Sequence, residues 1–121
     1  MHPAIEQKRQ DISRICRLHH VRRLEVFGSA ARGSDFDPAS SDADFLVEFV
    51  PDARKGLDTY FSLKTALERL LQRGVDLVES GAVRNPYLLA DINRARQVIY
   101  ALPALRQAVE EALAGLGGQS K

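Results

Sequence analysis

Two aspartates, Asp42 and Asp44, have the side-chain type and the spacing of metal ligands. They stand two residues apart at the start of the apolar run "ADFLVEFV", and side chains two apart on a β-strand point to the same face. Two like charges held this close repel each other, and apolar surroundings also remove their hydration. Because a divalent cation neutralises both, the pair predicts a metal site with oxygen ligands suited to Mg²⁺.

A third carboxylate, Asp76, lies between Val75 and Leu77 in the short apolar run "VDLVE". This run predicts a strand, and a buried carboxylate in such a strand needs a partner. If the strand pairs beside the one that carries Asp42 and Asp44, three carboxylates converge on one cation. The residues alone also allow a plainer arrangement, in which Asp42 belongs to a turn and Asp76 is exposed on an edge strand.

The Gly28-Ser29 pair follows the strand-like run "RLEVF" and precedes the short helical run "SAARG". Glycine lets the backbone approach a ligand closely, and the N-terminus of a helix offers free N–H groups to an anion. Arg32, one helical turn further on, would add a guanidinium to bound phosphates or would simply be solvated. A plain turn with Ser29 as the helix N-cap fits the same residues, and neither the dinucleotide-binding nor the P-loop glycine pattern is present.

The elements that position these residues follow from apolar periodicity and from the places of Gly and Pro. Their order predicts a small mixed α/β sandwich with three strands. The predicted helices cover about 3–20, 29–33, a long segment that ends at Gly74, helical material from Pro86, and a final helix over about 103–115; the predicted strands are "RLEVFG", "ADFLVEFV" and "VDLVE"; a loop covers 34–41 and a frayed tail 116–121.

The composition suits one domain over residues 1–121, because 121 residues with 45% hydrophobic content bury a core without a disulfide. The 17 basic and 16 acidic residues leave almost no net charge, so neither stable nucleic-acid binding nor attraction to a membrane surface is expected. Cys16 is the single cysteine, which indicates a reducing compartment, and no apolar run approaches the ~20 residues of a membrane span. We therefore expect a cytoplasmic protein.

The runs "FGSAARG", "SDADFLV" and "VDLV" together resemble the minimal nucleotidyltransferase (MNT) family of the polymerase-β superfamily. The resemblance spans Leu24 to about Tyr100. It implies an α+β domain whose core covers about 20–100, with a small mixed sheet of three or four strands flanked by helices. One departure is the loop before the aspartates: twelve residues separate Ser29 from Asp42, two more than in the family pattern.

The resemblance also implies a role for each residue. Gly28 and Ser29 would bind the nucleotide triphosphate, Asp42 and Asp44 would bind Mg²⁺, and Asp76 would complete the site and help to activate an attacking hydroxyl. The expected reaction is attack of that hydroxyl on the α-phosphate of ATP, with pyrophosphate as the leaving group. Two Mg²⁺ ions are the cofactors that such a site implies.

Short members of the family resemble antitoxins, which points to the acceptor. The leading hypothesis is transfer of AMP to a tyrosine of a cognate HEPN-type ribonuclease toxin, within a homo-oligomer or a hetero-oligomer with that toxin. A second hypothesis is a non-catalytic antitoxin that inhibits its partner by tight binding. A third is a small-molecule transferase of the aminoglycoside-modifying type. The basic positions available for the binding hypothesis are Lys8, Arg9, Arg14, Arg17, Arg22 and Arg23.

Overall fold

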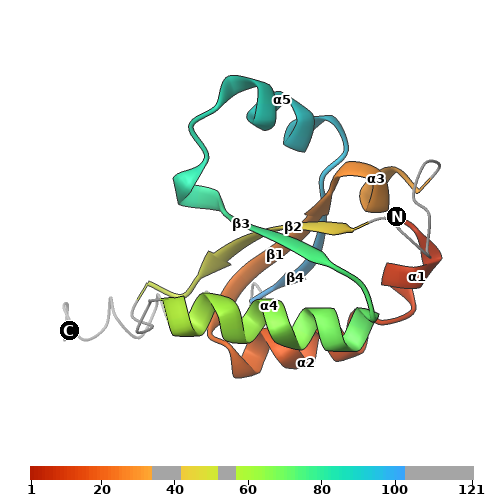
Figure 1. Ribbon diagram of the computed structural model, residues 1–121, viewed down its shortest axis with the longest axis vertical. Helices are drawn as coiled ribbons and strands as arrows, with labels where there is room; N and C mark the ends of the chain where they lie inside the picture. Colours follow the sequence, from red (N-terminus) through yellow and green to blue (C-terminus); the bar gives the residue numbers. More distant parts are fainter. Residues whose placement is uncertain (34–41, 52–56, 103–121) are drawn as a thin grey trace, which may run out of the picture.

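The computed structural model describes residues 1–33, 42–51 and 57–102 (Figure 1). The predicted final helix over about 103–115 and the tail lie outside the described residues, as does the loop 34–41. The elements in chain order are α1 (Pro3–Glu6), α2 (Arg9–Leu18), β1 (Val21–Phe27), α3 (Gly28–Arg32), β2 (Ala43–Phe49), α4 (Leu57–Leu71), β3 (Val75–Glu79), the 3₁₀ turn η1 (Ser80–Ala82), α5 (Pro86–Arg94) and β4 (Gln97–Ala101).

The four strands form one mixed sheet in the order β3-β2-β1-β4. β1 pairs antiparallel with both β2 and β4, and β2 pairs parallel with β3. The predicted α+β class is confirmed, and the sheet has the fourth strand that the family resemblance allowed.

The boundary between α5 and β4 differs from the prediction of continuous helical material after Pro86. The helix ends at Arg94, and Gln97–Ala101 pairs with β1 instead. Val98, Ile99 and Tyr100 are β-branched or aromatic, so their preference for a strand is realised once β1 offers a pairing edge.

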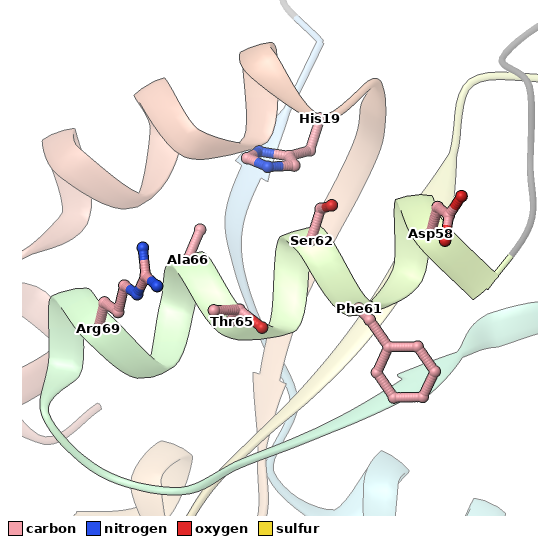
Figure 2. Close-up of a pocket in the computed structure, with 7 residues that line it drawn as sticks. All are labelled: His19, Asp58, Phe61, Ser62, Thr65, Ala66 and Arg69. Carbon is pink, nitrogen blue, oxygen red and sulfur yellow. The ribbon is translucent and has the colours of Figure 1, made fainter.

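Helices α2 and α4 form one layer on the sheet, whereas α5 lies on the opposite side (Figure 1). The outer side of the α2–α4 layer carries a cavity of about 500 Å³, in which His19, directly after α2, lies over Ser62 and Ala66 of α4 (Figure 2). Among the described helices, none has the length and apolar character that crossing a membrane requires.

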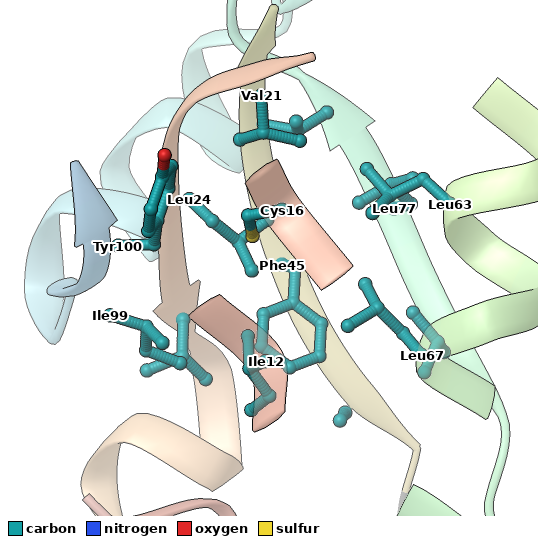
Figure 3. Packing of buried hydrophobic residues seen from close by; sticks show 14 of the residues in the cluster. Ile12, Cys16, Val21, Leu24, Phe45, Leu63, Leu67, Leu77, Ile99 and Tyr100 are labelled. Carbon is teal, nitrogen blue, oxygen red and sulfur yellow. The ribbon is translucent and has the colours of Figure 1, made fainter. Parts of the chain in front are cut away.

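The main core lies between the sheet and the α2–α4 layer. Ile12 and Cys16 of α2 and Leu63 and Leu67 of α4 pack against Phe45 in the middle of β2, all of them fully buried (Figure 3). Burial of each large apolar side chain contributes roughly 1.5–3 kcal/mol, so this cluster holds β2 in place. Burial also raises the pKa of the Cys16 thiol to about 12, which leaves it unreactive at neutral pH.

A smaller cluster of Phe27, Leu46 and Ile92 lies on the other face of the sheet. It joins the end of β1 and the middle of β2 to α5. Because side chains alternate along a strand, the residues next to Leu46 on this face are Asp44 and Glu48. The α5 face of the sheet is therefore the one on which Asp44 lies.

Candidate active site

Asp44 and Asp76 lie opposite each other on adjacent strands. The parallel register of β2 and β3 pairs the two residues directly, and Phe27 is the partner of Asp44 on the other side. Both carboxylates therefore lie on the α5 face of the sheet. They are close to the first residues of β2 and to the start of α3. The predicted pairing of the strand that carries Asp44 with the strand that carries Asp76 is confirmed.

The exposure of Asp76 differs from the prediction of a buried carboxylate. Asp76 is exposed, because β3 is the outer strand of the sheet and only one of its edges is covered. The alternative in which Asp76 is exposed on an edge strand is thus confirmed as far as exposure is concerned. Asp76 nevertheless lies opposite Asp44.

The carboxyl group of Asp44 is electrostatically strained in its ionised form. Its pKa is raised to about 7, first by burial, then by a hydrogen bond with the Asp76 side chain, and further by the negative charges of Asp76, Asp42 and Asp91. Burial and the neighbouring carboxylates therefore disfavour the ionised form of Asp44. A divalent cation at the same position would favour that form.

Asp42 lies immediately before β2 rather than within it. The neighbouring backbone is fixed by a hydrogen bond of 3.0 Å that the Ala43 N–H donates to the Gly74 carbonyl. The Asp42 carboxylate rests so closely on Gly74 that a Cβ atom there would overlap it. Gly74, interpreted from sequence only as a helix stop, therefore also makes room for an acidic side chain.

The backbone of Gly28 lies directly against the Asp44 side chain. Its φ of +68° is a conformation that other residues adopt with strain, and a Cβ at this position would stand 2.5 Å from the Asp44 Oδ2 atom. The backbone at the start of α3 thus approaches the Asp44 carboxylate as closely as glycine permits. This contact follows from the register of β1 and β2, which pairs Phe27, the residue before Gly28, with Asp44.

Ser29 and Arg32 occupy the two ends of the short helix α3. Phe27 is the N-cap and Ser29 lies in the first turn, so the prediction of Ser29 as the N-cap is wrong. Arg32 is exposed in the last turn. The structure brings Gly28 to the Asp44 carboxylate, whereas the contributions of Ser29 and Arg32 to phosphate binding stay predictions.

The donor set suits a hard cation such as Mg²⁺, because carboxylate oxygens are its preferred ligands and two such groups, Asp44 and Asp76, lie opposite each other. Within residues 1–33, 42–51 and 57–102, however, no three Asp, Glu, His or Cys side chains form a group that could hold a metal ion. The predicted three-carboxylate cluster is thus a close pair, Asp44 and Asp76, with Asp42 nearby. The physical reason is that Asp42 precedes the strand, so the two-residue alternation does not extend to it.

Sequence reasoning missed Asp91, a fourth carboxylate on this face. It lies on α5, where Arg94 Nη1 stands 3.7 Å from its Oδ1, and its charge contributes to the raised pKa of Asp44. No local pattern marks Asp91, since only the packing of Ile92 against Phe27 and Leu46 places α5 here.

Sequence reasoning also missed the buried Glu25 on β1. Glu25 is 4% exposed and accepts hydrogen bonds from Arg96 Nε at 3.1 Å and from Arg96 Nη2 at 2.5 Å. Arg96 lies two residues after the end of α5, so this ion pair connects the segment that follows α5 to the sheet. An acidic residue within the apolar run "RLEVF" was the available signal.

Comparison with known proteins agrees with this geometry. The model of the nucleotidyltransferase domain family matches residues 8–99. "Putative protein adenylyltransferase MJ0128" of Methanocaldococcus jannaschii is 41% identical over 76 residues, which cover 61% of this chain and 71% of the relative. A solved structure described as a "putative minimal nucleotidyltransferase" has 33% identity and a TM-score of 0.64, with 80% of this chain and 95% of the other covered.

A further solved structure shares the fold at 15% identity, with a TM-score of 0.57 and 95% of this chain and 83% of the other covered: the tri-AMPylated Shewanella oneidensis HEPN toxin in complex with MNT antitoxin. The family model covers most of the chain, and the residues that form the paired-carboxylate site lie within the match. The chain therefore belongs to the nucleotidyltransferase domain family and is a nucleotidyltransferase of the minimal type.

Proposed function

We propose that this chain uses Mg²⁺ to transfer AMP from ATP to a tyrosine hydroxyl of a HEPN-type toxin and so acts as an antitoxin. The observation that carries the proposal is the Asp44–Asp76 pair, set against Gly28 on an open face of the sheet. The similarity to a protein adenylyltransferase supports the choice of a protein acceptor. The fold shared with a complex that contains an AMPylated HEPN toxin supports the choice of partner.

Each residue has a definite task in this proposal. Gly28 lets the triphosphate approach the backbone, and Ser29 and Arg32 contribute polar contacts to the phosphates. Asp76, which is exposed, accepts the proton of the incoming hydroxyl. The hydroxyl oxygen then bonds to the α-phosphorus while the bond to the departing pyrophosphate breaks.

Mg²⁺ held by Asp44 and Asp76, with Asp42 as the further ligand that the family resemblance implies, would supply the positive charge that stabilises the phosphate oxygens during transfer. The half-buried position of Asp44 between two strands fixes its carboxylate, since the register with Phe27 and Asp76 leaves it little freedom. Asp42 and Asp76 remain open to solvent and to an incoming substrate.

The open face supports a macromolecular acceptor over a small molecule. Small-molecule sites are concave and bury most of their ligand, whereas two of the three carboxylates here are exposed. The cavity beside His19 belongs to the α2–α4 layer and includes none of these carboxylates. A protein tyrosine carried on a partner surface would reach the exposed Asp76.

The non-catalytic binding hypothesis gains less support. It needs a basic surface free to meet a partner, but Arg9 donates to the Val98 carbonyl at 2.7 Å and Arg14 pairs with Asp11 at 3.2 Å. The proposal instead treats residues 1–121 as one catalytic domain that works in the cytoplasm, where ATP is available and a free cysteine stays reduced.

The test is incubation with ATP, Mg²⁺ and a HEPN-type protein that binds this chain, followed by the intact mass of that protein. The mass should increase by one or more AMP units with the wild type and not with Asp44→Asn or Asp76→Asn. Asp58→Asn, the same chemical change on the exposed surface of α4, is the matched control and should retain transfer. An unmodified partner that is nevertheless inhibited by Asp44→Asn would contradict the catalytic proposal.

A further inference from the structure

The three tyrosines of the chain differ sharply in access to solvent, and all three lie within the described residues. The Tyr60 hydroxyl donates a hydrogen bond to the Leu77 carbonyl, and Tyr100 is 7% exposed within the main core. Tyr87 is 84% exposed. A tyrosine hydroxyl of this chain that serves as an acceptor must therefore be that of Tyr87.

Tyr87 is presented on a fixed backbone. It lies in the first turn of α5, where Pro86 occupies the first helical position and the Asn85 Oδ1 atom accepts a hydrogen bond from the Tyr87 N–H at 2.8 Å. Such capping stabilises the first turn of α5. The backbone that carries the exposed Tyr87 ring is therefore held in a helical conformation.

Helix α5 also belongs to the face of the sheet that carries the carboxylates. Ile92 packs against Phe27, which directly precedes Gly28, and against Leu46, which lies on the same strand as Asp44. Tyr87 thus belongs to the helix that packs on this face of the sheet. Because the Tyr87 side chain is 84% exposed, a second copy of the chain can reach its hydroxyl.

We propose that Tyr87 is itself an AMP acceptor and that it is modified by a second copy of this chain. The inference rests on the proposed nucleotidyl transfer to tyrosine. The phenolic oxygen of Tyr87 bonds to the α-phosphorus of ATP bound by the other copy, the bond from that phosphorus to the bridging oxygen breaks, and pyrophosphate leaves. The phenolic proton passes to Asp76 of the copy that binds the ATP, and the product is a tyrosyl-AMP phosphodiester.

Two variants separate the acceptor from the enzyme. The Asp44→Asn chain keeps Tyr87 but lacks the site, and the Tyr87→Phe chain keeps the site but lacks the acceptor hydroxyl. After incubation with ATP and Mg²⁺, trypsin cleaves after Arg84 and Arg94 and releases NPYLLADINR, whose one hydroxyl side chain is that of Tyr87. Mass spectrometry then reads the modification of that peptide.

The expected result is a mass increase of one AMP on this peptide from the wild type and from the mixture of the two variants, but from neither variant alone. In the wild type, the labelled fraction formed per unit time should rise with protein concentration. The same Tyr87→Phe preparation is tested on the HEPN-type partner in parallel.

An unlabelled peptide, although Tyr87→Phe transfers AMP to the partner, overturns the inference and leaves the proposed function standing. Labelling of the wild type without labelling in the mixture also overturns it, because transfer would then occur within one copy. Absence of transfer to both acceptors refutes the proposed function and the inference together.

Discussion

Replacement of Asp44 by asparagine is predicted to stabilise the protein in the absence of divalent cations while abolishing AMP transfer. The carboxyl of Asp44 is held beside Asp76 with its pKa raised from 3.8 to about 7. Its ionised form is therefore disfavoured in the folded state and not in the unfolded state. Asparagine has a similar shape without the charge, so it removes this penalty together with a metal ligand.

The pKa shift sets the size and the sign of the effect. Between the two pKa values the folded state binds more protons, so the free energy of unfolding falls as pH rises from about 4 to about 7. At 1.36 kcal/mol per pKa unit, the full shift corresponds to about 4 kcal/mol. Solvent beside the exposed Asp42 and Asp76 screens the charges, which reduces this to about 2 kcal/mol.

Thermal unfolding followed by circular dichroism, in EDTA at several pH values, measures this difference. At about pH 8, Asp44→Asn should melt some ~5–10 °C above the wild type, a shift that matches about 2 kcal/mol in a domain of this size. The gap should narrow as the pH falls from about 7 to about 4 and close below that, where the wild-type carboxyl is protonated in the folded and in the unfolded state. Asp58→Asn should melt within ~2 °C of the wild type at both pH values, since exposed surface substitutions change stability little.

Mg²⁺ extends the test. It should raise the melting temperature of the wild type at about pH 8 and leave that of Asp44→Asn unchanged, because ligand binding to the folded state alone increases stability. The transfer rate of the wild type should likewise rise from about pH 5 to about pH 7 as Asp44 loses its proton. An Asp44→Asn variant that is less stable than the wild type at about pH 8 in EDTA, or a gap that does not change with pH, would refute this reasoning.

Two further substitutions test the groups that position the site. Gly28→Ala should lower the free energy of unfolding, measured by urea denaturation, by about 2 kcal/mol or more, because residue 28 has a positive φ and a Cβ there would crowd Asp44 Oδ2. Gly81 has open space around it, so the control Gly81→Ala should lower the free energy of unfolding by less than about 0.5 kcal/mol. Arg96→Ala leaves the carboxylate of the buried Glu25 without its bidentate partner and should cost about 3 kcal/mol, whereas the exposed pair of Arg94 with Asp91 should contribute under about 1 kcal/mol. If Gly28→Ala and Gly81→Ala lowered the free energy of unfolding equally, the close contact of Gly28 with Asp44 would be contradicted. If loss of the Arg96–Glu25 pair cost no more than loss of the Arg94–Asp91 pair, the structural role of the buried pair would be contradicted.

The fold was largely predictable because the sequence of β2 clearly indicates a buried strand. A near-continuous apolar run that ends at Pro51 predicts a central strand, and β2 has neighbours on both sides. The residues after Pro86 were harder to assign, because the pairing of Gln97–Ala101 with β1 is a long-range contact that no local pattern contains.

The candidate site was predictable where it depends on strand register and not where it depends on tertiary position. Spacing and apolar context placed Asp44 and Asp76 on two strands, and the register of the sheet confirms the hypothesis that these strands pair. The exposure of Asp76 follows from the order of strands, and the proximity of Asp91 follows from how α5 packs back over the sheet. Neither the strand order nor the place of α5 is encoded in a local run of residues.

Transfer of isotope from ATP to the HEPN-type partner tests the central claim most directly. With wild-type protein and Mg²⁺, label at the α-phosphate should remain on the partner, whereas label at the γ-phosphate should appear only in released pyrophosphate, because AMP is the group transferred. Asp44→Asn should leave the partner unlabelled from either substrate. Stable γ-phosphate label on the partner, or α-phosphate label that persists with Asp44→Asn, would contradict nucleotidyl transfer by the Asp44–Asp76 site.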